Sequence, residues 1–138
     1  MTAVASWLAL ALLASSAERV DWMRLRGLNY KTGRVNADAK ALDGAVIKIM
    51  GYMVPFDDDQ NKAAEFLLVP TLGACIHIPA PPPNQLILVN MDAGQRAQVY
   101  WDKPVWVEGR LKIETAKGPY GNASYRLLAT KVDVYKDY

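Results

Sequence analysis

The fold follows above all from one stretch of the sequence, Ile47-Lys48-Ile49-Met50-Gly51-Tyr52-Met53-Val54. Within the longer run Ala45–Phe56, apolar side chains fall on alternate positions, which is the period-two pattern of a β-strand. Gly51 stands in the middle of this run, where a strand can bend or bulge. The sequence therefore predicts a long, curved strand here.

A second stretch, Val105-Trp106-Val107-Glu108-Gly109-Arg110-Leu111, repeats the pattern within a predicted strand Val105–Thr115. A glycine in mid-strand lets the strand coil strongly and contribute to both sides of a small closed barrel. Three further apolar runs predict strands at Glu65–Val69, Gln85–Met91 and Tyr125–Tyr135. About five strands favour a mainly β fold, a small closed or partly open Greek-key β-barrel of the oligonucleotide/oligosaccharide-binding (OB) type. A two-sheet sandwich would need roughly seven strands.

The segments between these strands are predicted to contain little regular structure. Asp21–Arg26 reads as a short helical turn that docks Trp22 and Leu25 on the domain. Leu28–Asp43 is polar and shows no sustained apolar period. Asp57–Lys62 predicts a solvated hairpin tip, because its aspartates are consecutive and lack the alternate spacing of a calcium loop.

Composition narrows the classes of function. The 138 residues suit one domain, and a hydrophobic content of 51% is typical of a globular chain. Sixteen basic residues against 14 acidic ones give a net charge of +2. This charge is too small to favour nucleic acid or an anionic membrane surface as a partner.

The first residues have the features of a secretory signal. An apolar run, Ala3–Ala14, is followed by the small residues Ser15-Ser16-Ala17 and then by the charged pair Glu18-Arg19. The run is shorter than the roughly 20 residues that cross a bilayer, so a buried helix is the remaining alternative. No Lys or Arg precedes the run, which departs from the usual signal pattern. We expect residues 1–17 to be a signal peptide and residues 18–138 to form a single β-barrel domain in the periplasm.

One segment, Gly73–Gln85, contains both the only cysteine and the only histidine of the chain. In an extended backbone Cys75 and His77 are two residues apart and lie on the same side. Zinc and copper accept both thiolate and imidazole ligands, so this pair is a candidate metal site. Two ligands do not make a tight site, and the others would come from a partner protein or from carboxylates. The candidate carboxylates are Asp57, Asp58, Asp59 and Glu65.

Cys75 has two other interpretations. A neighbouring imidazole lowers the pKa of a thiol, so Cys75 with His77 would suit a thiol-dependent enzyme or a redox protein. Such an enzyme also needs an oxyanion hole and a substrate pocket, which the sequence does not indicate. Alternatively, Cys75 is a small buried residue and His77 hydrogen-bonds loop carbonyls.

Four prolines make the same segment rigid. Each fixes φ and lacks a backbone N–H, which predicts an extended, polyproline-type segment on the surface. We expect this segment to contact a partner protein, with nearby aromatic side chains completing the interface. The expected contact residues are Pro79, Pro81, Pro82, Pro83, Asn84 and Gln85, with Tyr100, Trp101, Trp106 and Tyr120 as the aromatic residues. The alternative is that the prolines only hold Cys75 and His77 in place.

Three motifs resemble a known family: Gly51-Tyr52-Met53-Val54-Pro55, Glu65-Phe66-Leu67-Leu68-Val69-Pro70, and the run Gly73–Gln85. They are similar to the signature of the bacterial family catalogued as domain of unknown function 3299, over about residues 20–135. Ala80 stands where many relatives have another proline. The resemblance implies an exported, periplasmic or lipid-anchored protein of Gram-negative bacteria with no assigned reaction. It also implies genes beside an ABC transporter and a periplasmic metal-binding protein, and hence an accessory role in zinc or other metal homeostasis.

The sequence therefore favours a non-enzymatic periplasmic accessory or binding protein. Its expected partners are periplasmic or inner-membrane components of an ABC transport system, with no nucleic acid and no transmembrane span in the mature chain. Zinc or copper at Cys75 and His77 is the candidate cofactor. Two alternatives stay open: a thiol-dependent enzyme or redox protein, and an OB module that binds a ligand or an oligonucleotide.

Overall fold

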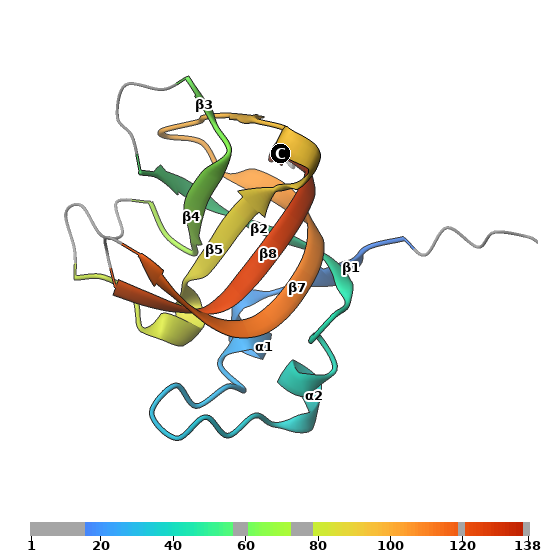
Figure 1. Ribbon diagram of the computed structural model, residues 1–138, viewed down its shortest axis with the longest axis vertical. Coiled ribbons are helices and arrows are strands. Elements are labelled where there is room, and N and C mark those ends of the chain that lie inside the picture. Colours follow the sequence, from blue (N-terminus) through green and yellow to red (C-terminus); the bar gives the residue numbers. More distant parts are fainter. Residues whose placement is uncertain (1–15, 57–60, 73–78, 119–120, 137–138) are drawn as a thin grey trace, which may run out of the picture.

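Five strands close into a ring in the computed structural model, which describes residues 16–56, 61–72, 79–118 and 121–136 (Figure 1). Around the ring they are β2 (Val46–Pro55), β4 (Glu65–Val69), β5 (Ile87–Met91), β8 (Gly121–Val134) and β7 (Val105–Gly118). β7 pairs back on β2, which closes the ring. β5 and β8 run parallel and the other ring pairs are antiparallel. The mainly β fold with an OB-like ring of five strands is confirmed.

β2 pairs with two different strands along its length, and the change of partner falls at Gly51. Its residues 46–51 pair with β7, and its residues 52–55 pair with β4. A Cβ at Gly51 would lie 2.8 Å from the carbonyl oxygen of Val69 and 2.8 Å from the side chain of Leu68. The expected bend in this strand is therefore present, and the absence of a side chain lets β4 lie close.

β7 also carries its glycine at an irregularity. The register between β7 and β8 shifts between Glu108 and Gly109. A Cβ on Gly109 would lie 2.1 Å from the carbonyl oxygen of Leu128 and 2.7 Å from the Cα of Ala129, well inside van der Waals contact. Gly109 thus allows the backbone of β8 to approach β7 at a bulge, as the mid-strand glycine predicted.

The inner side of the ring holds the main hydrophobic cluster. Alternate residues of each ring strand face it, which is why Ile47 and Ile49 are fully buried while their neighbours in β2 are only half-buried. The largest buried side chains of this cluster are Tyr125, Phe66, Leu25, Leu42, Ile47, Ile49, Leu68, Ile87, Leu111 and Leu127.

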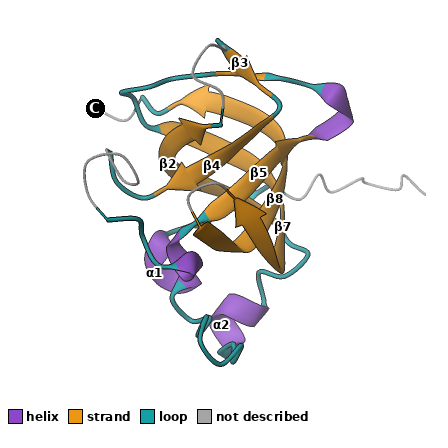
Figure 2. Cartoon of the chain, turned by 60° about the vertical axis from the view of Figure 1, so that its left-hand side comes forward, coloured by secondary structure: helices purple, strands orange, loops and turns teal. Residues whose placement is uncertain are grey.

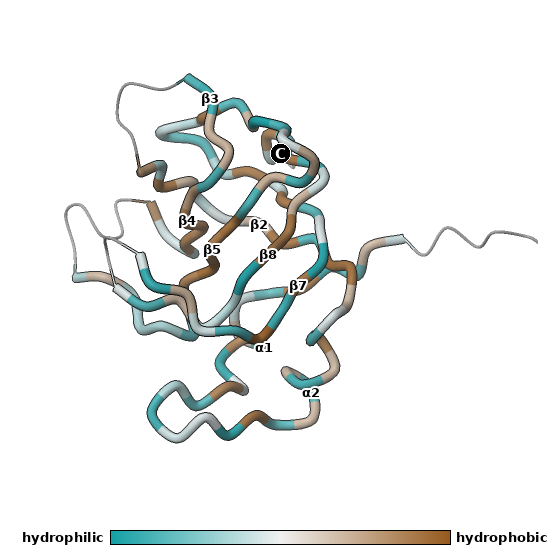
Figure 3. The backbone as a smooth tube through the Cα atoms, in the orientation of Figure 1, coloured by the Kyte–Doolittle hydropathy of each residue, from teal (hydrophilic) through white to brown (hydrophobic). Residues whose placement is uncertain are grey.

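A second hydrophobic cluster lies on the other side of β4 and β5. Leu67, Val69 and Leu88 alternate with residues of the main cluster, so they occupy the outer face of the ring, yet they are at most 3% exposed. Ala116 and Ala123, from the far end of the β7–β8 hairpin, pack against them. Residues 66–69 of β4 and residues 87–89 of β5 are therefore buried on both faces, which explains why these stretches are apolar without a break. Figure 3 shows the hydrophobic colour along these two strands.

The N-terminal part of the chain packs on one end of the ring (Figure 2). β1 (Glu18–Val20) pairs in parallel with β2, α1 (Trp22–Leu25) follows with Asp21 as its N-cap, and α2 (Ala37–Lys40) begins after the N-cap Asn36. The predicted helical turn that docks Trp22 and Leu25 is confirmed: Leu25 is fully buried, and Trp22 packs against the core and donates from Nε1 to the carbonyl oxygen of Met50 at 2.7 Å. No helix of the described residues is long and apolar enough to cross a membrane.

Several short elements were not predicted, and some strand limits differ. The unpredicted elements are β1, α2, β3 (Lys62–Ala63), β6 (Ala97–Gln98) and the single-turn 3₁₀ helices η1 (Pro83–Gln85) and η2 (Asp92–Gly94). β3 pairs with β6 outside the ring. The strand expected from Gln85 begins at Ile87, because the backbone N–H groups of Gln85 and Leu86 bond to Pro82 and Pro83 in the η1 turn. β7 and β8 extend beyond their expected ends into a long hairpin.

Replacing Gly109 by alanine tests the close approach of β8. We expect Gly109→Ala to lower the free energy of unfolding by at least about 2 kcal/mol, because the neighbouring atoms are backbone and cannot move aside. Gly118→Ala on the same strand is the control, since its nearest neighbour would be 3.4 Å away, and it should change stability by less than about 0.5 kcal/mol. Urea denaturation measures both, and equal stabilities would contradict the role of Gly109.

Candidate functional site

The predicted metal pair, Cys75 and His77, lies outside the described residues, as do Asp57, Asp58 and Asp59. Glu65, the remaining candidate carboxylate, accepts a hydrogen bond at Oε2 from Nδ2 of Asn90 at 2.9 Å. Within the described ranges, no group of three or more His, Cys, Asp or Glu side chains is placed to hold a metal ion. Metal binding by Cys75 and His77 stays a prediction.

The proline segment, residues 79–83, is described and lies at the surface. Pro79 and Pro82 are exposed, while Pro81 and Pro83 are half-buried. Pro82 has φ −62° and ψ 158°, which is the polyproline conformation, and Pro83 starts the η1 turn. The segment therefore presents pyrrolidine rings outward at the point where the chain enters β5.

Asn84 and Gln85 are buried beneath this segment and point into the protein. Nδ2 of Asn84 donates to the carbonyl oxygen of Leu28 at 3.0 Å. Nε2 of Gln85 donates to the carbonyl oxygen of Trp22 at 2.9 Å and to that of Asn84 at 2.9 Å. Their amides therefore bind the N-terminal segment, so that partner contact at this site would fall on the prolines.

A third side chain binds the same N-terminal segment. The hydroxyl of Tyr125 donates to the carbonyl oxygen of Leu25 at 2.7 Å, and burial raises the pKa of Tyr125 to about 12. Asn84, Gln85 and Tyr125, which we call the clasp, thus bind the carbonyl groups of Leu28, Trp22 and Leu25. These bonds hold α1 and the turn that follows it against the ring.

The clasp could hardly be predicted from the sequence. Tyr125 falls on an inward position of an alternating strand, where a tyrosine is ordinary core. The only available signal was the pair of amides Asn84-Gln85 directly before an apolar strand, since buried amides need hydrogen-bond partners.

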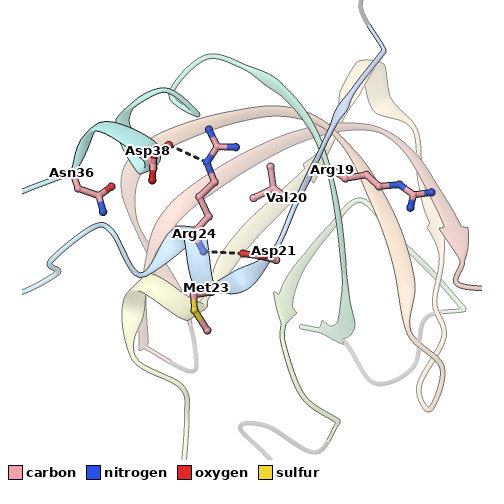
Figure 4. Close-up of a pocket in the computed structure, with 7 residues that line it drawn as sticks. All are labelled: Arg19, Val20, Asp21, Met23, Arg24, Asn36 and Asp38. Carbon is pink, nitrogen blue, oxygen red and sulfur yellow. Dashed lines mark hydrogen bonds between the residues drawn. The ribbon is translucent and has the colours of Figure 1, made fainter.

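A cavity of about 510 Å³ lies where β1, α1 and α2 meet (Figure 4). Arg24 crosses it: Nε donates to the carbonyl oxygen of Asp38 at 3.1 Å, and Nη1 pairs with the carboxylate of Glu18. The side chains of Asp21 and Asn36 accept backbone N–H groups as helix caps. Arg24 thus joins β1, α1 and α2, whereas Asp21 and Asn36 each cap their own helix. Its lining residues are Arg19, Val20, Asp21, Met23, Arg24, Asn36 and Asp38.

The aromatic residues expected at the interface have different surroundings. Trp106 lies on β7 with its ring centroid 5.3 Å from that of Tyr135, and Arg19 and Lys48 lie over its ring at 5.3 and 5.0 Å. These contacts join β1, β2 and β7 on their outer side. Trp101 is exposed, Tyr100 packs against the core, and Tyr120 lies outside the described residues.

The face that OB-type rings use for ligands is closed in the described structure. Such rings bind oligonucleotides and oligosaccharides on the outer face of their second and third strands, which are β4 and β5 here. This face carries the second hydrophobic cluster, covered in part by the β7–β8 hairpin. A ligand could reach β4 and β5 only by displacing that hairpin.

Comparison with known proteins gives a family and a similar structure. The family model described as "Protein of unknown function (DUF3299)" matches residues 23–134. The crystal structure of a DUF3299 family protein from Pseudomonas aeruginosa PAO1 is similar, with 30% sequence identity and a TM-score of 0.71. The match covers 89% of this chain and 99% of that one. No curated protein matches the chain.

Removing the hydroxyl of Tyr125 tests the clasp. Tyr125→Phe removes this donor from the carbonyl of Leu25, which keeps only the backbone N–H of Leu28 at 3.3 Å, and should cost about 0.5–1.5 kcal/mol of stability. Tyr30→Phe, at an exposed tyrosine, is the control and should have almost no effect. Hydrogen exchange at Leu25 and Leu28 should accelerate only in Tyr125→Phe; equal exchange in both variants would contradict the clasp.

The raised pKa of Tyr125 predicts a specific alkaline response. Its pKa is 10.0 when unperturbed and about 12 in the fold, so the unfolded chain loses this proton first as pH rises. The stability contributed by Tyr125 is therefore fully present below pH 10 and is lost as pH rises through 12. The advantage of the wild type over Tyr125→Phe should be constant below pH 10 and should then shrink. Denaturation from pH 9 to about 12 measures it, and a constant advantage would refute this assignment.

Proposed function

The chain belongs to the DUF3299 family, and we propose that it is an exported, non-enzymatic accessory protein of an envelope transport system. In this proposal the protein acts in the periplasm by binding a partner, a periplasmic or inner-membrane component of an ABC transporter. The contact is made by the exposed prolines of residues 79–83.

The observation that carries the proposal is the way this segment is held. Pro79 and Pro82 are exposed, while the two residues after the prolines, Asn84 and Gln85, are buried and bonded to the carbonyl groups of Leu28 and Trp22. The segment is thus already ordered before a partner binds, so little conformational entropy is lost on binding. Polyproline segments are bound in this way by aromatic-lined grooves.

The position of β1 supports export. The expected signal ends at Ala17, and β1 begins at Glu18. Cleavage after Ala17 would therefore leave all three residues of β1 paired with β2. The mature chain would keep every described element of the fold.

Metal homeostasis is the finer form of the proposal. Cys75 and His77 precede the prolines by a few residues, so zinc or copper bound there, with a third ligand from the partner, would link metal to partner binding. The two competing functions are a thiol-dependent reaction at Cys75 and ligand binding by an OB module.

Site-specific photo-crosslinking in the periplasm tests the partner. A benzophenone amino acid at Ala80 should give a crosslinked product containing a transport component, and the same group at Thr130 on β8 should not. Replacing Pro79, Pro81 and Pro82 by alanine should abolish this product, whereas Pro104→Ala, outside the segment, should preserve it. Failure of Ala80 to crosslink, or equal products from both positions, would contradict the proposal.

Metal titration of the reduced mature protein tests the finer form. Zinc or copper should bind more tightly than about 1 mM, and Cys75→Ser and His77→Ala should each weaken binding by about tenfold or more. Asp133→Asn, an exposed carboxylate that pairs with Lys131, is the control and should bind as the wild type does. Equal affinity of all variants would refute the metal site. If Cys75 reacts with thiol reagents only after denaturation, a thiol-dependent reaction at Cys75 is excluded.

A further inference from the structure

A second surface, remote in sequence from the proline segment, lies on the outer face of β5, β8 and β7. A groove of about 320 Å³ opens there. Three cations and one carboxylate lie around it, together with an amide and two leucines. The lining residues are Asn90, Arg110, Lys112, Glu114, Arg126, Leu127 and Leu128.

Two of the cations face each other across the β7–β8 pair. Lys112 and Arg126 are register partners, and Arg110 lies two residues before Lys112 on the same face of β7, opposite Leu128. Like charges directly opposite each other in a sheet are destabilising. A like-charged pair in register is a local departure from favourable pairing, and such departures are expected at functional sites.

The single carboxylate does not neutralise the group. The nearest oxygen of Glu114 is 3.6 Å from Nζ of Lys112 and 3.9 Å from Nε of Arg126, both ion-pair distances beyond a hydrogen bond. Nη1 of Arg126 donates to Oδ1 of Asn90 at 3.2 Å. Nε of Arg126 is buried and has no hydrogen-bond acceptor among the described residues. One guanidinium N–H therefore lacks the acceptor that an anion would supply.

The apolar surface of the groove comes mainly from Leu128, which is 47% exposed and lies between the cations. The side chain of Leu127 is fully buried in the main cluster on the inner side of the ring. The geometry points to a binding site for a phosphate group attached to an apolar body. Arg126 and Lys112 bind the phosphate oxygens, Arg110 adds charge at the rim, and the apolar part rests on Leu128.

Two kinds of ligand carry a phosphate group attached to an apolar body: a soluble phosphate monoester and an anionic phospholipid, whose headgroup contains the phosphate. Both present the same charged oxygens beside carbon, so the groove fits either. Phenyl phosphate represents the first source, and phosphatidylcholine vesicles with about one-third phosphatidylglycerol represent the second. Inorganic phosphate has the charged oxygens but no apolar part, so its binding measures the contribution of charge alone.

The test follows the Nε–H signal of Arg126 by NMR during titration. Phenyl phosphate should shift this signal with a Kd of about 1 mM, and inorganic phosphate should bind about tenfold more weakly because it lacks the apolar part. Lys112→Gln should weaken phenyl phosphate binding about tenfold. Arg126→Gln lacks the Nε–H, so its binding is followed at the backbone amide of Leu128, and it should be weakened to the same extent. Lys131→Gln is the matched control, a lysine of β8 outside the groove lining that pairs with Asp133 at 3.4 Å, and it should change Kd less than twofold.

Stability and vesicle binding complete the test. Lys112→Gln should keep or raise the Tm, because it removes the repulsion with Arg126, so its loss of binding cannot be ascribed to unfolding. Co-sedimentation with the vesicles that depends on Lys112 identifies a headgroup; phenyl phosphate binding without co-sedimentation identifies a soluble ester. The proposal is overturned if neither probe binds, or if Lys112→Gln and Lys131→Gln bind equally.

Discussion

The ring depends on the close approach of two backbones at Gly109. β7 must pair with β2 on one side and with β8 on the other, and β8 lies so near that no side chain fits between them. Gly51 provides the same freedom where β2 leaves β7 and joins β4. Hydrophobic burial supplies most of the stabilisation but is not directional. The closure of these strands into a ring therefore depends on the absence of a side chain at Gly51 and Gly109.

The clasp joins the N-terminal segment, which is not part of the ring, to β8 and to the residues before β5. Asn84 and Gln85 precede β5 and Tyr125 belongs to β8, yet all three bind one short stretch after β1. The amide of Asn84 and the hydroxyl of Tyr125 are buried donors, so each would lack this acceptor inside the protein if the N-terminal stretch came away. The exposed prolines are ordered by the same bonds. The surface that we assign to a partner and the packing of the N-terminal segment are thus one structural unit.

Much of the ring could be predicted from the sequence, but the candidate sites could be predicted only in part. Alternating residues and central glycines located β2 and β7, and the run Glu65–Val69 gave β4 with its observed limits. β1, α2, β3 and β6 have two to four residues each, too few for a period to show, and tertiary pairing creates them. Burial of β4 on both faces was implicit in its unbroken apolar run. The clasp and the facing pair Lys112 and Arg126 depend on register between distant strands, which one sequence does not reveal.

The hydrogen bond between Tyr125 and Leu25 also has a consequence for the order of folding. Its two residues are 100 positions apart, and β1 pairs with a strand that begins 26 residues later. In a chain that leaves the ribosome from its N-terminus, α1 is made early, but its hydrogen bond to Tyr125 cannot form until β8 has followed. Contacts of such long range form slowly. The stretch that contains α1 thus reaches its final packing only when synthesis of the described strands is nearly complete.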